Sequence, residues 1–241
     1  PAKSPGLVER EVVRIITPGT VIDTSMLDAG SNNYIAGLAS YGNQVGLSYA
    51  DVSTGTFRLT EFEPSDEAVV DETVRLAPVE LVIPEGFIDH PLWEKISARL
   101  PGAVVNKVSS YSGSYKPAKQ VLLDHFGVVT LDCFDCEELK AGTIAAGILL
   151  GYLKQLQKDS LGQFTSLQSY KAEGYMVIDS ITRRHLELVK DTGSQKNTLF
   201  DVLNHTCTSM GKRLLKEMVQ QPLMDLEEIH ARLEAVGELK D

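Results

Sequence analysis

The stretch from Ala141 to Leu153 restricts the possible folds of this chain more than any other, because it is the most apolar part of the sequence. A helix here is apolar on nearly every side between Ile144 and Leu153, so it must be covered on most sides. A membrane span needs about 20 apolar residues, whereas this stretch is shorter and is interrupted by three glycines. We therefore predict a buried helix, opened by a D-x-x-E capping box at Asp135–Glu138 and running to about Lys158.

Three β-type runs lie upstream of that helix, at Tyr34–Ser40, Val45–Asp51 and Thr56–Phe62. Gly42–Asn43 separates the first two runs and Thr54–Gly55 separates the last two, and such pairs are hairpin signals. The pattern predicts an antiparallel meander of three strands.

Helices and strands alternate after the meander. The predicted helices are Ser65–Leu76, with Ser65 as its N-cap, Leu92–Leu100 and Ala118–Phe126, and the predicted strands are Leu81–Ile83 and Val104–Val108. A meander followed by such an alternation indicates an α/β domain with a mixed sheet.

The end of the chain has a purely helical pattern. Three apolar stripes recur at helical spacing: Ile178, Ile181, His185 and Leu188, ended by Gly193; Met210, Leu214, Leu215, Met218 and Val219, broken at Pro222; and Leu226, Ile229, Leu233 and Val236, opened by a cap at Asp225. We therefore predict an all-α part after the α/β domain.

These patterns divide the chain into four parts. Residues 1–20 form a lead-in, with a β-prone run at Val8–Ile16 and a turn at Thr17–Thr20. Residues 21–158 form the α/β domain, residues 159–175 are a polar connection without a sustained period, and residues 176–241 are the helical part.

The charge of the chain argues against direct binding to nucleic acid. Asp plus Glu number 33 against 23 Lys plus Arg, for a formal net charge of -10. Most of the excess lies in residues 21–170, which hold ten basic and nineteen acidic side chains. Because contacts to phosphate dominate the affinity of nucleic-acid binders, such a domain repels DNA, and its acidity points to a protein partner.

The cysteines and the start of the chain indicate the compartment. Cys133, Cys136 and Cys207 form an odd set with no disulfide framework, which is typical of a reducing environment. The sequence opens without an initiator Met and without the apolar region of a secretory signal, so we expect a piece of a longer chain, located in the cytoplasm and not in a membrane.

No nucleotide-binding motif is present in the sequence. The Gly211–Lys212 pair is followed by Arg213 where a P-loop needs Ser or Thr, and Thr206 stands where its first glycine belongs. The sequence also lacks G-x-G-x-x-G, so we expect no bound cofactor and interpret Gly211 as a packing position inside a helix.

The Cys133-x-x-Cys136 spacing fits a redox motif or half of a zinc site. A structural zinc needs four ligands, and neither Cys207 nor the five histidines supply a second paired spacing. We favour two small, partly buried thiols.

Carboxylates offer an alternative function, a metal-dependent nuclease of the ribonuclease H type that uses Asp51 and the acidic cluster at Asp132 and Asp135. Such enzymes carry their first catalytic Asp on the first strand, and Tyr34–Ser40 contains no carboxylate. We therefore favour a turn-organising role for Asp51 and a helix-capping role for the cluster. No other catalytic residue is predicted.

Two small basic clusters lie on the predicted helices, Arg183–Arg184 and Lys212–Arg213 with Lys216. The default interpretation is a solvated face. The alternatives are ion pairs between domains and a role in facing DNA within a larger assembly.

Several blocks of the sequence resemble the MutS family of mismatch-repair ATPases, in the family's order. The blocks are Arg10–Thr20, Ala50–Phe57, Asp179–Leu188, Thr198–Leu203, Thr208–Leu215, Pro222–Leu223 and Arg232–Leu239. Met218 stands where many members carry Trp, which is an exchange of one apolar side chain for another.

The resemblance implies a fragment with no catalytic activity of its own. It implies the end of the mismatch-binding domain at residues 1–20, a ribonuclease H-like connector domain without nuclease activity at 21–158, and the start of the helical core and lever domain at 176–241. The expected partners are MutL, the remaining MutS domains and the second MutS subunit. Mismatched DNA, ATP and Mg²⁺ are expected to bind only the intact protein. No catalytic, cofactor or metal residue is transferred to this chain, and the residues that bind partners stay unassigned.

Overall fold

The computed structural model describes residues 14–23, 27–28, 30–63, 67–109, 113–157, 161–171, 174–189 and 197–240. Most of the run Val8–Ile16, the predicted N-cap Ser65, the predicted helix end Lys158 and Gly193 lie outside these residues. Arg14–Ile16, the described end of that run, form no strand. Helix α1 (Ala68–Leu76) follows Glu67 as its N-cap residue.

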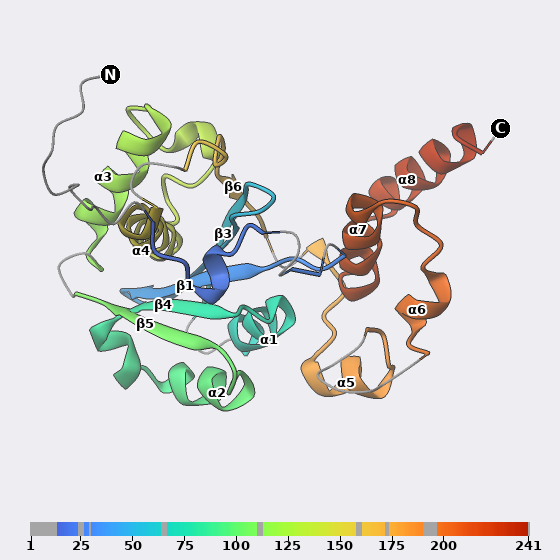
Figure 1. Cartoon of the computed structure of the whole chain (residues 1–241), viewed down its shortest axis with the longest axis horizontal. Coiled ribbons are helices and arrows are strands. Elements are labelled where there is room, and N and C mark those ends of the chain that lie inside the picture. The colour runs from blue at the N-terminus through green and yellow to red at the C-terminus, as the bar shows by residue number, and fades with distance from the viewer. Residues whose placement is uncertain are drawn as a thin grey trace, which may run out of the picture.

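One mixed sheet forms the centre of the first part of the chain (Figure 1). Its strands are β1 (Tyr34–Tyr41), β2 (Gln44–Asp51), β3 (Thr56–Phe62), β4 (Glu80–Pro84), β5 (Val104–Val108) and β6 (Gln168–Ser169), in the order β5-β4-β1-β2-β3-β6. The pairs β1–β2 and β2–β3 are antiparallel, whereas β4, β5 and β6 run parallel to their neighbours. The predicted meander is confirmed.

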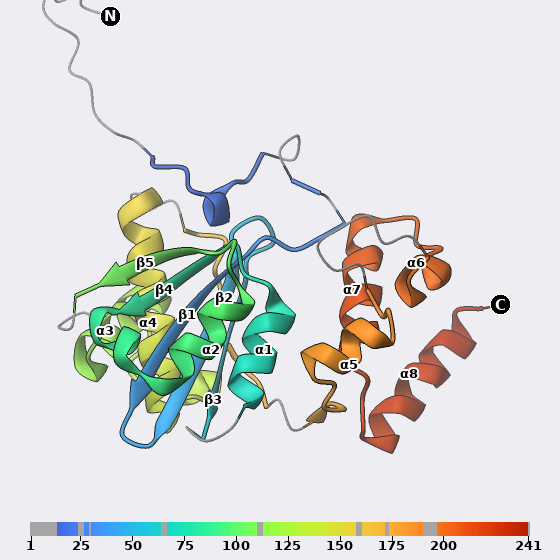
Figure 2. The same cartoon turned by 90° about the horizontal axis from the view of Figure 1, so that it is seen from below.

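Helices cover both faces of this sheet because its side chains alternate between two cores. Along β1, Ile35 and Ala39 belong to the core under α3 (Tyr115–Phe126) and α4 (Lys140–Gln157). Ala36 and Leu38 belong to the opposite core, under α1 and α2 (Pro91–Arg99). Figure 2 shows α1 and α2 on one side of the strands and α4 on the other.

The predicted apolar helix is α4, with 18 residues, and it is buried as expected. Its backbone comes so close to the sheet that two strand positions must be glycine. A Cβ at Gly46 would lie 2.1 Å from the Ala141 carbonyl oxygen, and one at Gly37 would lie 2.4 Å from the Ala145 carbonyl oxygen. No helix in the described ranges has both the length and the apolar character needed to cross a bilayer.

The predicted capping box of this helix is wrong. Helix α4 begins at Lys140, and Asp135 lies several residues earlier with a left-handed backbone, φ 52°, instead of the extended backbone of an N-cap. Glu61 of β3 takes over the role, since its Oε2 accepts hydrogen bonds from the backbone N–H of Ala141 (2.8 Å) and Gly142 (3.1 Å).

The lead-in is attached to the sheet through a buried carboxylate. The turn predicted at Thr17–Thr20 is a 3-10 helix, Pro18–Thr20. The Thr17 hydroxyl and the Gly19 N–H donate to Glu80 Oε2, at 2.7 and 2.9 Å, and Glu80 is 1% exposed on β4. Thr17 and Gly19 are therefore fixed to β4.

The polar connection contributes more to the α/β fold than its sequence indicates. Leu161, Phe164 and Leu167 are buried in the core under α4, and β6 pairs with β3. Three isolated apolar residues and a two-residue strand are too short to produce a periodic pattern.

The remainder of the described chain is helical. It comprises α5 (Ser180–His185), α6 (Leu199–Leu203), α7 (Ser209–Gln220) and α8 (Leu226–Glu238). Side chains cap all four helices, including the predicted cap Asp225, which accepts from the N–H groups of Glu227 and Glu228. The expected fold class, an α/β domain followed by helices, is confirmed.

Two glycines of α4 test the close packing of this helix. A Cβ at Gly147 would lie 2.4 Å from the Ala118 carbonyl oxygen of α3, so Gly147→Ala should lower the free energy of unfolding by about 1–3 kcal/mol. Gly151 has nothing within 4 Å of its Cβ position, so Gly151→Ala should raise it by up to about 1 kcal/mol. Urea denaturation measures both, and equal shifts in the two variants would contradict the packing of α4 against α3.

Candidate functional site

Asp51 organises a turn, as the sequence predicts. Its side chain is fully buried at the end of β2. Oδ2 accepts from the Asn33 N–H (3.1 Å), while Oδ1 accepts from the N–H and hydroxyl of Ser53 (2.9 and 2.6 Å). The two oxygens thus hold the turn after β2 and the segment before β1.

The nuclease alternative finds no support. Asp132 lies in a 3-10 helix that ends before Asp135, and both side chains are exposed. In the described ranges, no three His, Cys, Asp or Glu side chains are grouped so that they could hold a metal ion. The neighbouring Glu137 pairs with Lys119 and accepts from the Leu131 N–H, so this carboxylate closes a loop.

The two cysteines of the C-x-x-C spacing differ in environment. Cys133 is exposed and Cys136 is buried, and neither forms a disulfide. Burial raises the pKa of Cys136 to about 12, and the neighbouring Cys133 and Glu137 add to the effect. A redox cysteine needs a readily formed thiolate, so the environment of Cys136 is unfavourable for that chemistry.

The residues that gather from distant parts of the chain lie between the α/β domain and the helical part. Two backbone hydrogen bonds join the segment before α5 to the segment between α7 and α8, from Met176 N–H to the Pro222 carbonyl (2.8 Å) and from Met224 N–H to the Gly174 carbonyl (3.4 Å). Side chains of α1, β3, α5 and α7 complete this contact.

Glu72 of α1 is the centre of that contact. It forms a two-pronged ion pair with Arg75 (2.7 and 2.8 Å), and each side chain is 7% exposed. The Tyr170 hydroxyl donates to its Oε1 (2.8 Å), and Gln221 Nε2 reaches its Oε2 (3.4 Å) from the end of α7. Burial alone would raise the pKa of Glu72, but the hydrogen bonds and positive charge of Arg75 outweigh it, and the pKa is lowered.

A second ion pair joins the two parts directly. Arg58 of β3 reaches Glu217 of α7 with 3.2 Å between Nη1 and Oε1, and its Nε donates to Gln168 of β6 (3.1 Å). About a third of each partner's side chain in the ion pair is exposed, so water screens this pair more than it screens Glu72 and Arg75.

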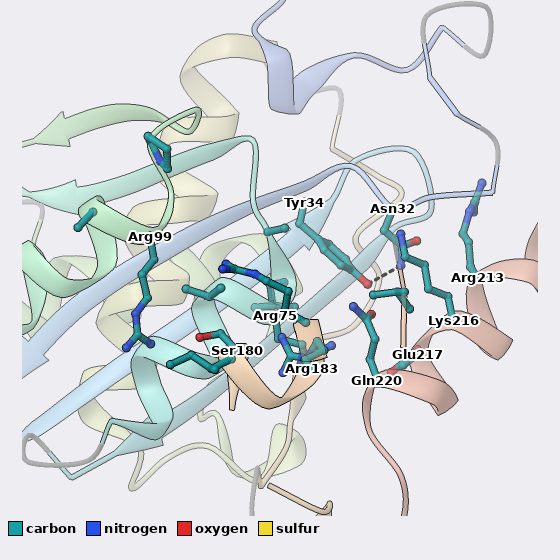
Figure 3. Close-up of a pocket in the computed structure, with 18 residues that line it drawn as sticks. Asn32, Tyr34, Arg75, Arg99, Ser180, Arg183, Arg213, Lys216, Glu217 and Gln220 are labelled. Atoms are coloured by element: carbon teal, nitrogen blue, oxygen red, sulfur yellow. Dashed lines mark hydrogen bonds between the residues drawn. The ribbon is translucent and has the colours of Figure 1, made fainter. Parts of the chain in front are cut away.

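Next to these contacts lies a cleft of about 690 Å³, shown in Figure 3. Residues at the start of β1, at the ends of α1 and α2, and along α5 and α7 line it. Six of the lining side chains are basic and one is acidic: Arg75, Arg99, Arg183, Arg184, Arg213, Lys216 and Glu217. The cleft is therefore a positively charged region in an acidic chain.

Both basic clusters found in the sequence contribute to this cleft, so an entirely solvated face is the wrong interpretation for them. Arg183 donates to the Ile178 carbonyl (3.0 Å), while its Nε is buried without a hydrogen-bond partner. Burial lowers the pKa of Arg183, and the positive charge of Arg75 lowers it further. Burial also lowers the pKa of Lys216.

No sequence pattern predicts the contact between Glu72, Arg75, Tyr170 and Gln221, because their spacing along the chain is irregular. In the sequence, Glu72 and Arg75 look like an ordinary i,i+3 pair on a helix surface. Only the fold brings Tyr170 and Gln221 over them and excludes water.

Removing the charge of Glu72 tests the buried pair. Glu72→Gln leaves the Arg75 guanidinium buried without a counter-charge, and we expect the free energy of unfolding to fall by about 3 kcal/mol at pH 7. Asp71→Asn on the same helix breaks the more exposed Arg99 pair and should cost less than about 1 kcal/mol. Chemical denaturation of the two variants compares them, and equal losses would contradict a central role for Glu72.

The lowered pKa of Glu72 also predicts how the difference in free energy of unfolding between the wild type and Glu72→Gln depends on pH. A carboxyl whose pKa is lower in the folded chain stabilises it above the unfolded pKa and loses that effect as the pH falls. Protonated Glu72 resembles glutamine, so the stability difference between the wild type and Glu72→Gln should shrink as the pH falls from about 4, the ordinary pKa of a glutamate, through the lower pKa of folded Glu72. A difference that stays constant down to pH 3 would contradict the assignment.

Comparisons with known proteins agree with the fold and the resemblance. The model of MutS domain II matches residues 33–165, and that of MutS domain III matches residues 181–241. The chain is 41% identical over 244 residues to the DNA mismatch repair protein MutS of Desulfosudis oleivorans, covering 100% of this chain and 28% of that protein. It is 39% identical over 246 residues to that of Symbiobacterium thermophilum, covering 99% and 28%.

A third relative, the DNA mismatch repair protein MutS of Methanosarcina barkeri, is 36% identical over 255 residues, covering 99% of this chain and 28% of that protein. The chain thus spans 28% of the length of these curated relatives. The domain II model alone matches more than half of the chain. This chain therefore belongs to the MutS family and matches its domain II over residues 33–165 and its domain III over residues 181–241.

Proposed function

We propose that this chain is the connector region and the start of the core and lever region of a mismatch-recognition ATPase, and that it has no catalytic activity of its own. The proposed boundaries are a lead-in at residues 1–20, the connector at 21–158, a link at 159–175 and the helical part at 176–241. The whole protein would act in the cytoplasm with a second MutS subunit and would bind mismatched DNA, ATP and Mg²⁺. This chain would relay the mismatch and nucleotide states between domains and present a docking surface for MutL.

The charged contact between the two parts is the observation that supports the relay. Arg58 meets Glu217 across it, and the Glu72 ion pair is reached by Gln221. A polar contact can separate without exposing a large apolar surface, so the two parts can change their relative position at low cost. Relaying a state by movement requires such a contact.

The charge of the connector supports a docking role for a protein. Residues 21–158 hold ten basic and eighteen acidic side chains. An acidic surface of this kind can speed association with a basic partner and select it. Exposed carboxylates gather at two places, one at Glu85, Asp89 and Glu94 and the other at Asp132, Asp135 and Glu138.

The relay is tested in the whole protein with a double-mutant cycle on Arg58→Ala and Glu217→Ala. We expect each single variant to change the coupling free energy between mismatch binding and nucleotide binding by about 0.5–2 kcal/mol. The double variant should change it by less than the sum of the two single changes. The measurement is nucleotide affinity with and without mismatched DNA.

Lys95→Ala is the control for this cycle, because Lys95 of α2 forms an exposed ion pair with Glu67 inside the connector and not with the helical part at residues 176–241. Unchanged coupling in the Arg58 and Glu217 variants would contradict the relay and reduce the chain to a structural spacer.

Docking is tested by calorimetric titration of the chain with MutL at physiological salt. We expect micromolar or tighter binding, weakened at least about tenfold by reversing one of the two acidic groups to lysine. Reversal of Glu227, Glu228 and Glu234 on α8 is the matched control, since it adds the same charge to the helical part. Undetectable binding, or equal binding by all three triple variants, would contradict docking through the acidic connector surface.

A further inference from the structure

Basic side chains dominate the lining of the cleft between the connector and the helices. The lining holds six basic side chains and one acidic one, Glu217. Glu72 and Asp71 pair with Arg75 and Arg99, while Asp179 and Asp28 attract Arg183 and Lys216 without forming a salt bridge to them. The whole chain, in contrast, has a formal net charge of -10.

Two cations of the cleft keep unused donors. The Nε of Arg183 is buried and has no hydrogen-bond partner; the charge of Arg75 repels Arg183, while those of Glu72, Asp71 and Asp179 attract it. Within the described ranges, Lys216 makes no hydrogen bond or salt bridge; Asp28 attracts it and Lys212 repels it from a greater distance. Burial lowers the pKa of Arg183 and of Lys216, so both would gain from a counter-charge.

Neutral polar groups also line the cleft between these cations. Asn32 donates to the Tyr34 hydroxyl (2.5 Å) at the start of β1, and Ser180 and Gln220 face the cleft from α5 and α7. In Figure 3, Arg75 and Arg183 lie between Arg99 on one side and Lys216 and Arg213 on the other. The cleft therefore offers a row of donors with cations from both parts of the chain.

We propose that this cleft binds a compact anion with several phosphate groups, which bridges the connector and the helical part. Guanidinium groups match phosphate oxygens with paired hydrogen bonds. The volume of about 690 Å³ lies within the range of about 300–1,000 Å³ typical of small-ligand sites.

A compact ligand fits better than a long polyanion. The surrounding connector is strongly acidic, so a nucleic acid that extends beyond the cleft meets repulsion, whereas a small anion stays within the positive region. The sequence has no glycine-rich phosphate loop, so recognition depends on side-chain cations and not on backbone N–H groups.

The experiment is a calorimetric titration of the chain with inorganic tripolyphosphate at physiological ionic strength, with sulfate at equal ionic strength as the reference anion. We expect saturable binding of one tripolyphosphate per chain and at least about tenfold weaker binding of inorganic phosphate, because fewer charge-assisted hydrogen bonds form. Adenosine triphosphate without Mg²⁺ is a further arm. If adenosine triphosphate binds as tightly as tripolyphosphate, the phosphates are the recognised group. If it binds more tightly, the ligand of the cleft also carries a nucleoside.

Two substitutions connect the binding to the cleft. Arg183→Gln and Lys216→Gln should each weaken tripolyphosphate binding about tenfold, the value expected from loss of one charge-assisted contact. Lys107→Gln removes the same charge from exposed β5, outside the cleft, and should leave the affinity unchanged. Lys216 lies on a partly exposed helix face, so its variant keeps the test valid if Arg183→Gln fails to fold.

Three results would overturn the proposal. The first is no binding beyond that of sulfate. The second is an equal loss in the Lys107 control, which would indicate general charge attraction. The third is tighter binding of a twelve-residue oligothymidine or an oligoglutamate peptide that competes with tripolyphosphate, which would assign the cleft to a macromolecule.

Discussion

The fold depends on how closely the backbone of α4 approaches the central strands. Gly46 and Gly37 have no side chain, and the helix occupies the space where their Cβ atoms would lie. At this distance the apolar side chains of α4 pack between the sheet and α3 in one buried cluster. The positions of β1, β2 and α3 therefore follow from one helix, and the opposite face of the sheet remains available to α1 and α2.

Much of this architecture could be predicted from the sequence because it depends on local patterns. The meander followed from two turn signals between β-type runs, and α4 followed from its apolar composition. The capping of α4 could not be predicted, since Glu61 reaches the helix from a strand about 80 positions earlier. The strand β6 escaped prediction because two residues cannot show a period.

The site was less predictable than the fold for a related reason. Arg183 and Lys216 belong to the two basic clusters that the sequence reveals. Only the fold shows that they line one cleft together with Arg75 and Glu217. Glu72 gave no signal in the sequence, because its role as a buried ion-pair partner depends on Tyr170 and Gln221, which cover it only in the folded chain. Asp51 was interpreted correctly because one of its partners, Ser53, lies in the turn that follows it, whereas its bond to Asn33, 18 positions earlier, gave no signal.

The attachment of the lead-in to Glu80 has a mechanical consequence. Thr17 and Gly19 hold a carboxylate of β4, and the Ile15 N–H is bonded to the Leu156 carbonyl at the end of α4. Force applied to residues 14–20 therefore acts through these hydrogen bonds on β4 and on the end of α4 at the same time.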